Sequence, residues 1–280
     1  MGPKKEKYWE WFNQMLRDSP DSILQGKLSP ADFPAIAAKY GVKSIELVNV
    51  FYFSKVEDLS FWISFKEKCK QSDISVNLIM CDGLGNLGDN DFLERTKAVE
   101  NHYKWVDIAK LLGAQAIRVN AAGQGSKEEV AKNAIEGLTQ LGKYGDSKGI
   151  NILVENHGGY SSNGSWLAGV MKKVAMDNVG TLPDFGNFCI EHGSDGCLES
   201  YNRYQGIAEL MPFAKGVSAK SHEFDENGNE VNFDFYKIMR IVKDSGYKGK
   251  IGIEYEGNEL SEDEGIIATM NLLKKVIEQL

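Results

Sequence analysis

Cysteine and histidine are scarce in this chain of 280 residues, which contains four of each. No two cysteines are separated by just two residues, so the CxxC pair found in structural zinc sites and redox motifs is absent. Four cysteines also make too sparse a set for a disulfide-rich scaffold. We therefore expect all four to be reduced packing residues of a cytoplasmic protein, with no signal peptide in the sequence unless one has already been removed.

Long apolar runs and an excess of basic residues are also missing. No stretch of 18 apolar residues occurs, so we expect no membrane span. The formal net charge is -8, and the one basic cluster is the N-terminal "MGPKKEK". Nucleic-acid-binding proteins usually carry a basic face. The sequence thus favours partners other than nucleic acid and membrane.

What the sequence does contain is a regular alternation of short apolar runs with longer helical patterns. The starts of these runs lie about 30 to 40 residues apart, the length of a strand, a crossover helix and two loops. Seven predicted strands begin at Lys43, Ile74, Ala116, Ile150, Gly180, Gly216 and Lys250. Capping-box patterns, Ser126 with Glu129 and Ser261 with Glu264, predict the starts of two of the helices.

Seven strand–helix units predict an α/β fold, a (β/α)8 TIM barrel forming a single domain over residues 1–280. Only residues 8–15, "YWEWFNQM", could supply the first strand, and they could equally form a short helix, so residues 1–29 would be an atypical first unit. The alternative is an open, doubly wound sheet. No GxGxxG follows the first predicted strands, which argues against a dinucleotide-binding sheet.

Acidic residues and one histidine recur at the ends of the last four predicted strands: Glu155, Asp184, His222 and Glu254. Their spacing is one strand–helix unit each, so on a closed barrel they converge at one rim. Three carboxylates brought together raise one another's pKa or require a cation. Oxygen ligands with one imidazole favour manganese, magnesium or cobalt over zinc. The alternative is that each residue forms its own salt bridge.

Further polar residues accompany this set. Lys220 alternates with His222 along one strand, as His157 does with Glu155 and Glu256 with Glu254, so each predicted pair points to one side of the sheet. Asn120 and Asn187 also follow predicted strands. We expect these five residues, His157, Lys220, Asn187, Glu256 and Asn120, to bind substrate.

The segments "ILVENHGG", "GTLPDFGNF", "GVSAKSHEFDENGN" and "IGIEYEG" together resemble the sugar phosphate isomerase/epimerase family with the xylose isomerase-like TIM barrel. The resemblance covers about residues 30–280. In that family a Glu, an Asp, a His and a Glu bind one divalent cation, which implies Glu155, Asp184, His222 and Glu254 here. Many relatives have a histidine where this chain has Asn187. DNA-repair endonucleases of the same barrel use a histidine-rich cluster of three zinc ions, which four histidines cannot build.

The resemblance implies a divalent-metal-dependent isomerase or epimerase of a keto-sugar or sugar phosphate, acting on a small-molecule carbohydrate. The reaction would pass through an enediolate, with Glu155 and Glu254 as catalytic acid and base. A dehydratase (a lyase) of a keto-polyol and a non-catalytic sugar-binding barrel remain alternatives. Barrels of this family often pair, so a homo-oligomer is also an open prediction.

Overall fold

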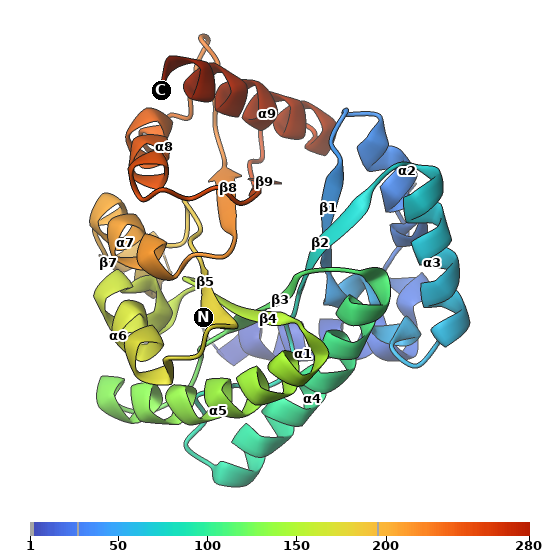
Figure 1. The fold of residues 1–280 in the computed structure, drawn as a ribbon, viewed down its shortest axis with the longest axis vertical. Coiled ribbons are helices and arrows are strands. Elements are labelled where there is room, and N and C mark those ends of the chain that lie inside the picture. Colours follow the sequence, from blue (N-terminus) through green and yellow to red (C-terminus); the bar gives the residue numbers. More distant parts are fainter. Residues whose placement is uncertain (1–2, 27, 195) are drawn as a thin grey trace. The chain divides into compact units, whose positions relative to one another are not determined.

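The computed structural model describes residues 3–26, 28–194 and 196–280. The chain forms two compact units, Met1–Ile152 with Met176–Val179 and Leu153–Ala175 with Gly180–Leu280. Strands β4 (Asn151–Glu155) and β5 (Val179–Leu182) each begin in the first unit and end in the second. They belong to a five-stranded sheet with the order β1-β2-β3-β4-β5 (Figure 1).

The first unit alternates strands and helices. Its elements are α1 (Pro3–Asp18), α2 (Phe33–Ala38), β1 (Ser44–Val48), α3 (Leu59–Gln71), β2 (Ser75–Met80), α4 (Phe92–Leu112), β3 (Ala116–Asn120) and α5 (Lys127–Lys148). Strand β2 pairs in parallel with both β1 and β3, and α4 and α5 run side by side (Figure 1). Parallel strands connected by helices are the arrangement that the sequence predicts for this part of the chain.

Residues 8–15 are helical, so the strand reading of this segment is wrong and its alternative, a helix, is confirmed. They lie within α1, where Phe12 and Leu16 are four residues apart and therefore on one helical face. Leu16 is almost completely buried, which anchors this face. Within the described residues before β1 there is no strand, so the first unit of the barrel departs from the usual pattern.

Helix ends follow the predicted capping. In α5 the Ser126 hydroxyl accepts a hydrogen bond from the backbone amide of Glu129, whose carboxylate accepts one from the amide of Ser126. Ser261 and Glu264 repeat this capping box at the start of α9. Each box satisfies two amides that have no partner within the helix.

The second unit carries the remaining elements. They are α6 (Gly164–Val174), β6 (Cys189–Gly193), β7 (Gly196–Ser200), α7 (Arg203–Leu210), β8 (Val217–Ser221), α8 (Phe235–Asp244), β9 (Ile251–Tyr255) and α9 (Glu262–Gln279). Strands β8 and β9 are parallel, with Lys220 opposite Glu254, and Asp184 forms a parallel bridge with Ser218. All seven predicted strands are therefore present, as β1 to β5, β8 and β9.

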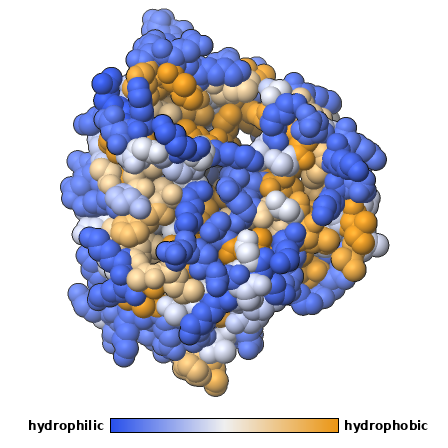
Figure 2. All heavy atoms as spheres, in the orientation of Figure 1, coloured by the Kyte–Doolittle hydropathy of each residue, from blue (hydrophilic) through white to orange (hydrophobic). Residues whose placement is uncertain are grey.

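On the face drawn in Figure 2, hydrophilic residues (blue) cover much of the surface and apolar residues (orange) show between them. Leu93 and Leu198 expose 73% and 70% of their surface, respectively. Scattered exposed apolar side chains are normal and mark no site by themselves. No helix in the described part of the chain has the length and apolar character needed to cross a membrane.

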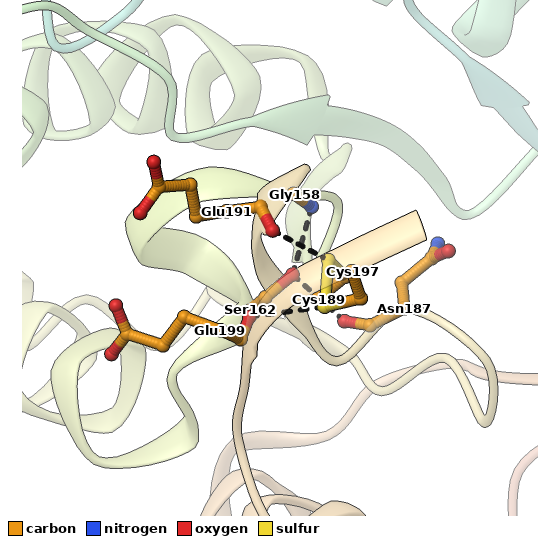
Figure 3. Close-up of a disulfide and its surroundings, with 7 residues drawn as sticks. All are labelled: Gly158, Ser162, Asn187, Cys189, Glu191, Cys197 and Glu199. Carbon is orange, nitrogen blue, oxygen red and sulfur yellow. Dashed lines mark hydrogen bonds between the residues drawn. A yellow bond between two sulfur atoms is a disulfide. The ribbon is translucent and has the colours of Figure 1, made fainter. Parts of the chain in front are cut away.

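An antiparallel hairpin, β6–β7, interrupts the strand–helix pattern, and a disulfide joins Cys189 to Cys197 across it (Figure 3). The prediction that all four cysteines are reduced is therefore wrong for this pair, while Cys69 and Cys81 are free and buried. The sequence conceals the bridge because a spacing of eight residues brings two cysteines together only when the chain folds back between them. The backbone amide of Tyr201 donates to the carbonyl of Phe188 at 2.8 Å, which closes the base of the hairpin.

Candidate metal and active site

Asp184 lies just beyond β5 and is completely buried. Its Oδ1 accepts hydrogen bonds from the backbone amides of Gly186 and Asn187, both at 2.8 Å. A side chain that bonds to the amides two and three residues ahead forms a local turn and fixes its own rotamer. Oδ1 of Asp184 thus stabilises the turn, and Oδ2, which takes no part in these two bonds, can bind a further group.

Asn156 fixes this turn from the neighbouring strand. Its side-chain amide donates to the carbonyls of Asp184 and Asn187, both at 3.0 Å, and its Oδ1 accepts from the amide of Asp184 at 2.8 Å. Asn156 is fully buried, and these three bonds connect the end of β4 to the Asp184 turn. Sequence reasoning missed Asn156, although its place directly after Glu155 in "ILVENHGG" put it at a strand end.

Glu155 ends β4 and is 1% exposed. Its Oε1 accepts a hydrogen bond from Asn187 Nδ2 at 2.9 Å, and Asn187 Oδ1 lies 3.4 Å from Lys220 Nζ. The structure therefore brings three of the predicted site residues, Glu155, Asn187 and Lys220, into one hydrogen-bonded chain. The Asn187 amide can serve both neighbours because it offers a donor and an acceptor.

Lys220 is 2% exposed and binds two carboxylates. Its ammonium lies 3.1 Å from Glu254 Oε1 and 3.0 Å from Glu256 Oε2. The second oxygen of Glu254 accepts from the Ser218 hydroxyl at 2.9 Å. Burial alone lowers the pKa of Lys220, but four nearby carboxylates, led by that of Asp184, outweigh it and raise this pKa above its usual value. Lys220 is therefore a fixed cation.

Three carboxylates meet here. Glu155, Asp184 and Glu254 each place one oxygen within 4.8 Å of the others. Burial raises the pKa of Asp184 to about 7; Lys220 opposes this rise, and the charges of Glu155 and Glu254 add to it. Three carboxylates gathered in a buried place repel one another, and this repulsion is unfavourable unless cations balance it.

The donor set fits a divalent metal ion. Asp184 Oδ2 is buried and has no hydrogen-bond partner in the part of the chain that the structure describes. The nearby Ser218 hydroxyl has one proton and donates it to Glu254. A buried carboxylate oxygen without a donor is costly, and a hard cation with oxygen ligands removes that cost. Glu155, Asp184 and Glu254 are the residues that would hold it.

His222 lies outside this three-carboxylate set. It follows β8, is partly buried, and its ring packs edge-on against Phe233 with centroids 6.5 Å apart. A side-chain carbon added to Gly186 would lie 3.2 Å from His222 Cε1 and 2.7 Å from Lys220 Cδ. Glycine at position 186 thus leaves space for both side chains beside the Asp184 turn, and metal binding by His222 stays a prediction.

The other predicted substrate-binding residues are placed differently. His157 lies beyond the end of β4 and is exposed, because the chain turns at Gly158, where φ is 80°. Its backbone amide donates to the Ser161 hydroxyl at 3.0 Å. Asn120 belongs to the first unit, where its amide donates to Asp82 at 2.9 Å. Substrate binding by His157, Asn120, Asn187, Lys220 and Glu256 stays a prediction.

A cavity of about 480 Å³ lies elsewhere in the second unit. Residues 229–236 and Leu272 line it, and none of the three carboxylates does. It therefore does not hold the chemistry that the carboxylates imply.

The family model of the xylose isomerase-like TIM barrel matches residues 34–276. The chain belongs to this family. The predicted fold class, an α/β (β/α)8 TIM barrel, is thereby confirmed, while its extent as one domain over residues 1–280 stays a prediction.

Solved structures agree with this fold. A xylose isomerase-like TIM barrel protein from Mycobacterium smegmatis, in complex with magnesium, is 17% identical with a TM-score of 0.67, covering 94% of this chain and 90% of that one. The IOLI protein with a bound zinc atom is 15% identical with a TM-score of 0.70, covering 90% and 96%. D-psicose 3-epimerase in the presence of D-fructose is 13% identical with a TM-score of 0.67, covering 90% and 93%. At these identities the likeness shows the fold alone.

A curated relative is similar over a short stretch. The C-glycoside deglycosidase alpha subunit of Arthrobacter globiformis is 37% identical over 67 residues, which make up 24% of this chain. The match spans only 19% of the relative's length.

Proposed function

We propose that this protein is a divalent-metal-dependent isomerase or epimerase of a small carbohydrate, a keto-sugar or a sugar phosphate. The observation that carries the proposal is the convergence of Glu155, Asp184 and Glu254 within 4.8 Å, with Asp184 Oδ2 buried and lacking a donor among the described residues. We propose His222 as a fourth ligand. When bound, a divalent ion polarises a carbonyl and stabilises the charge that develops on its oxygen.

Glu155 and Glu254 are the proposed acid and base. Isomerisation or epimerisation next to a carbonyl removes a proton from carbon to give an enediolate and then returns a proton. Each glutamate is held by fixed donors, Glu155 by Asn187 and Glu254 by Ser218 and Lys220. A carboxylate held in this way meets the substrate carbon in one orientation, which is what proton transfer requires.

Lys220 and Asn187 are the proposed anchors of substrate oxygens, with Glu256, His157 and Asn120 as further contacts. Lys220 keeps its proton, as the raised pKa implies, so it can donate hydrogen bonds but cannot act as the base. Asn187 has no ionisable group. The proton-transfer roles therefore fall to the carboxylates.

Deuterium incorporation tests the proposal. Chelator-free protein loaded with Mn²⁺ is incubated in deuterated water with a panel of ketoses and keto-sugars, and exchange at the carbon beside the carbonyl is followed by NMR. We expect exchange with wild type and at least 10²-fold slower exchange for Glu155→Gln and Glu254→Gln. Glu226→Gln, which removes an exposed acid from the second unit, is the matched control. Full-rate exchange by either site variant excludes the two-glutamate scheme.

Manganese, magnesium and cobalt are the proposed ions, because the set consists mainly of oxygen ligands. Magnesium and zinc are the ions in the two metal-bound relatives named above. Metal analysis of protein purified without chelator, followed by reconstitution with each ion, identifies the one that supports exchange.

A lyase is the second candidate, because the same three carboxylates could serve either reaction. The same enediolate can expel a group from the neighbouring carbon, as in a dehydratase. Mass spectrometry separates the two reactions. Isomerisation and epimerisation give a product with the mass of the substrate, whereas elimination gives a lighter product and a released group. A binding protein would give neither exchange nor cleavage with any substrate of the panel.

The cytoplasmic location stays a prediction from the sequence. The Cys189–Cys197 bridge favours an oxidising compartment instead, because thiols of cytosolic proteins are kept reduced. Homo-oligomer formation likewise stays a prediction, which light scattering of the purified protein checks.

A further inference from the structure

Glu230 is a buried acid that the proposed mechanism leaves unused. It is 7% exposed, and both of its carboxylate oxygens accept hydrogen bonds. Oε2 accepts from the backbone amides of His222 at 2.7 Å and Glu223 at 3.3 Å. Oε1 accepts from the backbone and side-chain amides of Asn232, at 2.9 and 2.8 Å. This one carboxylate therefore connects the two ends of the 222–232 loop.

The tip of the same loop has its own, separate support. Asp225 Oδ1 accepts from the backbone amides of Asn227 and Asn229, both at 2.8 Å. Lys275 on α9 donates to Asn229 Oδ1 at 2.9 Å. The tip is thus ordered without Glu230, and the Glu230 bonds act at the base of the loop, where His222 lies.

The His222 ring is supported from a second side. Phe233, which it meets edge-on, is stacked on Phe235 with centroids 5.6 Å apart. The Arg203 guanidinium lies 4.0 Å from the centre of the Phe233 ring. Phe233 is therefore fixed between two groups and forms a rigid wall beside His222. Backbone hydrogen bonds hold the carbonyls of Ser221 and Glu223 on either side of His222. The amide of His222 itself is held by the Glu230 carboxylate.

We propose that Glu230 is a positioning residue, which fixes His222 so that its imidazole faces the cluster of Glu155, Asp184 and Glu254. The inference rests on the proposed function in so far as His222 is a ligand of the metal. Groups that orient a ligand without touching the ion commonly change metal affinity by about 10- to 100-fold. Glu230 acts here through the ligand's backbone.

Substitutions at Glu230 and at the loop tip separate positioning from general support of the loop. Glu230→Ala removes all four accepted bonds. Glu230→Gln keeps one oxygen and turns an NH2 group toward the other donors, so it is the milder variant. Asp225→Ala is the matched control, because it removes one acid and its amide contacts from the tip of the same loop.

Three measurements follow on each full-length variant. Hydrogen exchange of the His222 backbone amide and the position of its imidazole resonance are recorded by NMR on metal-free protein. The Mn²⁺ dissociation constant is then measured by calorimetry. We expect Glu230→Ala to expose the amide to exchange, to shift the imidazole resonance and to raise the dissociation constant at least 10-fold. Glu230→Gln falls between wild type and Glu230→Ala, and Asp225→Ala stays within 2-fold of wild type.

Equal effects of Glu230→Ala and Asp225→Ala on the dissociation constant overturn the proposal, as does an unmoved imidazole resonance in Glu230→Ala. If Glu230→Ala does not fold, the same comparison is made with Glu230→Gln. If wild type takes up no Mn²⁺, the proposed function fails. The resonances of His222 in metal-free protein still decide the role of Glu230, because they depend on no ion.

Discussion

Among the described residues, an asparagine binds the backbone of an aspartate in the same way in each unit, but the two aspartates have different electrostatic surroundings. In the first unit Asn49 donates to the carbonyl of Asp82 at 3.0 Å and accepts from its amide at 2.9 Å. In the second, Asn156 donates to the carbonyl of Asp184 at 3.0 Å and accepts from its amide at 2.8 Å. Each asparagine follows one strand end and holds the aspartate that follows the next strand.

The carboxylates that these contacts position have different partners. Asp82 Oδ1 lies 2.6 Å from the guanidinium of Arg118 and accepts from Asn120 at 2.9 Å. Asp184 faces Glu155 and Glu254 instead, and Lys220 is shared among several carboxylates. In both units, therefore, an asparagine side chain that binds the backbone of an aspartate fixes this acid at a strand end. We expect the nearby cations to decide whether such an acid is structural or binds a metal.

The largest expected effect comes from Asp184→Asn. Asparagine can still accept from Gly186 and Asn187 through Oδ1, so the turn is kept while one charge of the cluster is lost. We expect at least 10³-fold weaker Mn²⁺ binding and no detectable deuterium exchange, because a hard cation binds carboxylates far better than an amide. Calorimetry and the exchange assay measure both, and circular dichroism checks the fold. Metal binding close to wild type would remove the proposed site.

Asp82→Asn should reduce stability and leave metal binding unchanged, the reverse of what we expect for Asp184→Asn. The substitution removes the carboxylate that lies 2.6 Å from the guanidinium of Arg118, whose side chain is almost fully buried. Breaking a buried ion pair by removing one partner costs about 3 kcal/mol. We expect the free energy of unfolding to fall by about this amount, with Mn²⁺ affinity unchanged. If Asp82→Asn reduced metal binding as strongly as Asp184→Asn, the contrast between the two units would not hold.

Removal of the Cys189–Cys197 disulfide should have the next largest effect. The Asn187 carbonyl accepts from the Ser162 hydroxyl at 2.9 Å, and the side-chain amide of Asn187 points away from the sulfur atoms (Figure 3). Replacing Cys189 and Cys197 by serine should lower the free energy of unfolding by about 2.5 kcal/mol, the loop-closure value for so short a loop. Because the base of the hairpin is closed by backbone, we expect deuterium exchange within 2-fold of wild type. A large loss of activity at unchanged stability contradicts this expectation.

The burial of Asp184 predicts a pH dependence of stability. In the metal-free folded protein the pKa of Asp184 is about 7, above its value of about 4 in an unfolded chain. Between these values the folded state binds the extra proton, so the contribution of Asp184 to stability is greatest below about pH 4 and falls as the pH rises to 7. From pH 5.5 to 8 this group should contribute a loss of about 2 kcal/mol.

Urea unfolding of metal-free protein across this range measures the loss, and Asp184→Asn should remove that part of the slope. Mn²⁺ affinity should change in the opposite direction and increase with pH, because protons compete for the same oxygen. A variant with the wild-type slope assigns the titration to a different group.

The smallest expected effects come from the two capping boxes, where the units should behave alike. Ser126→Ala in the first unit and Ser261→Ala in the second each remove one side-chain cap. Loss of a cap costs about 1 kcal/mol. Thermal unfolding of the two variants should show similar shifts, with no change in Mn²⁺ affinity. An effect of Ser261→Ala on metal binding would show that α9 contributes to the site.

The sequence predicts the parts of this protein that depend on periodic pattern. Seven strands and both capping boxes were correctly placed because hydrophobic alternation and local hydrogen bonds are encoded within a few residues. The convergence of Glu155, Asp184 and Glu254 followed from their unit spacing. It could be predicted because each acid lies at the end of a strand in a repeating architecture.

Other features depend on contacts between distant segments. Residues 8–15 have no clear alternation, and they form part of a helix whose residue Leu16 is buried. The Cys189–Cys197 bridge required knowledge of the hairpin. Asn156 and Glu230 escaped notice because an amide or acid that bonds to backbone groups gives no pattern in the sequence. His157 lies two residues beyond the end of β4, just before the turn at Gly158, and its role in binding substrate stays a prediction.

The hydrogen bond between Tyr201 and Phe188 returns the main chain almost to the point where the hairpin left it. The segment between them is therefore an insertion whose ends lie together, so its length and sequence could change in evolution or by design. Asp184 lies four residues before Phe188, outside this insertion, and would stay in place.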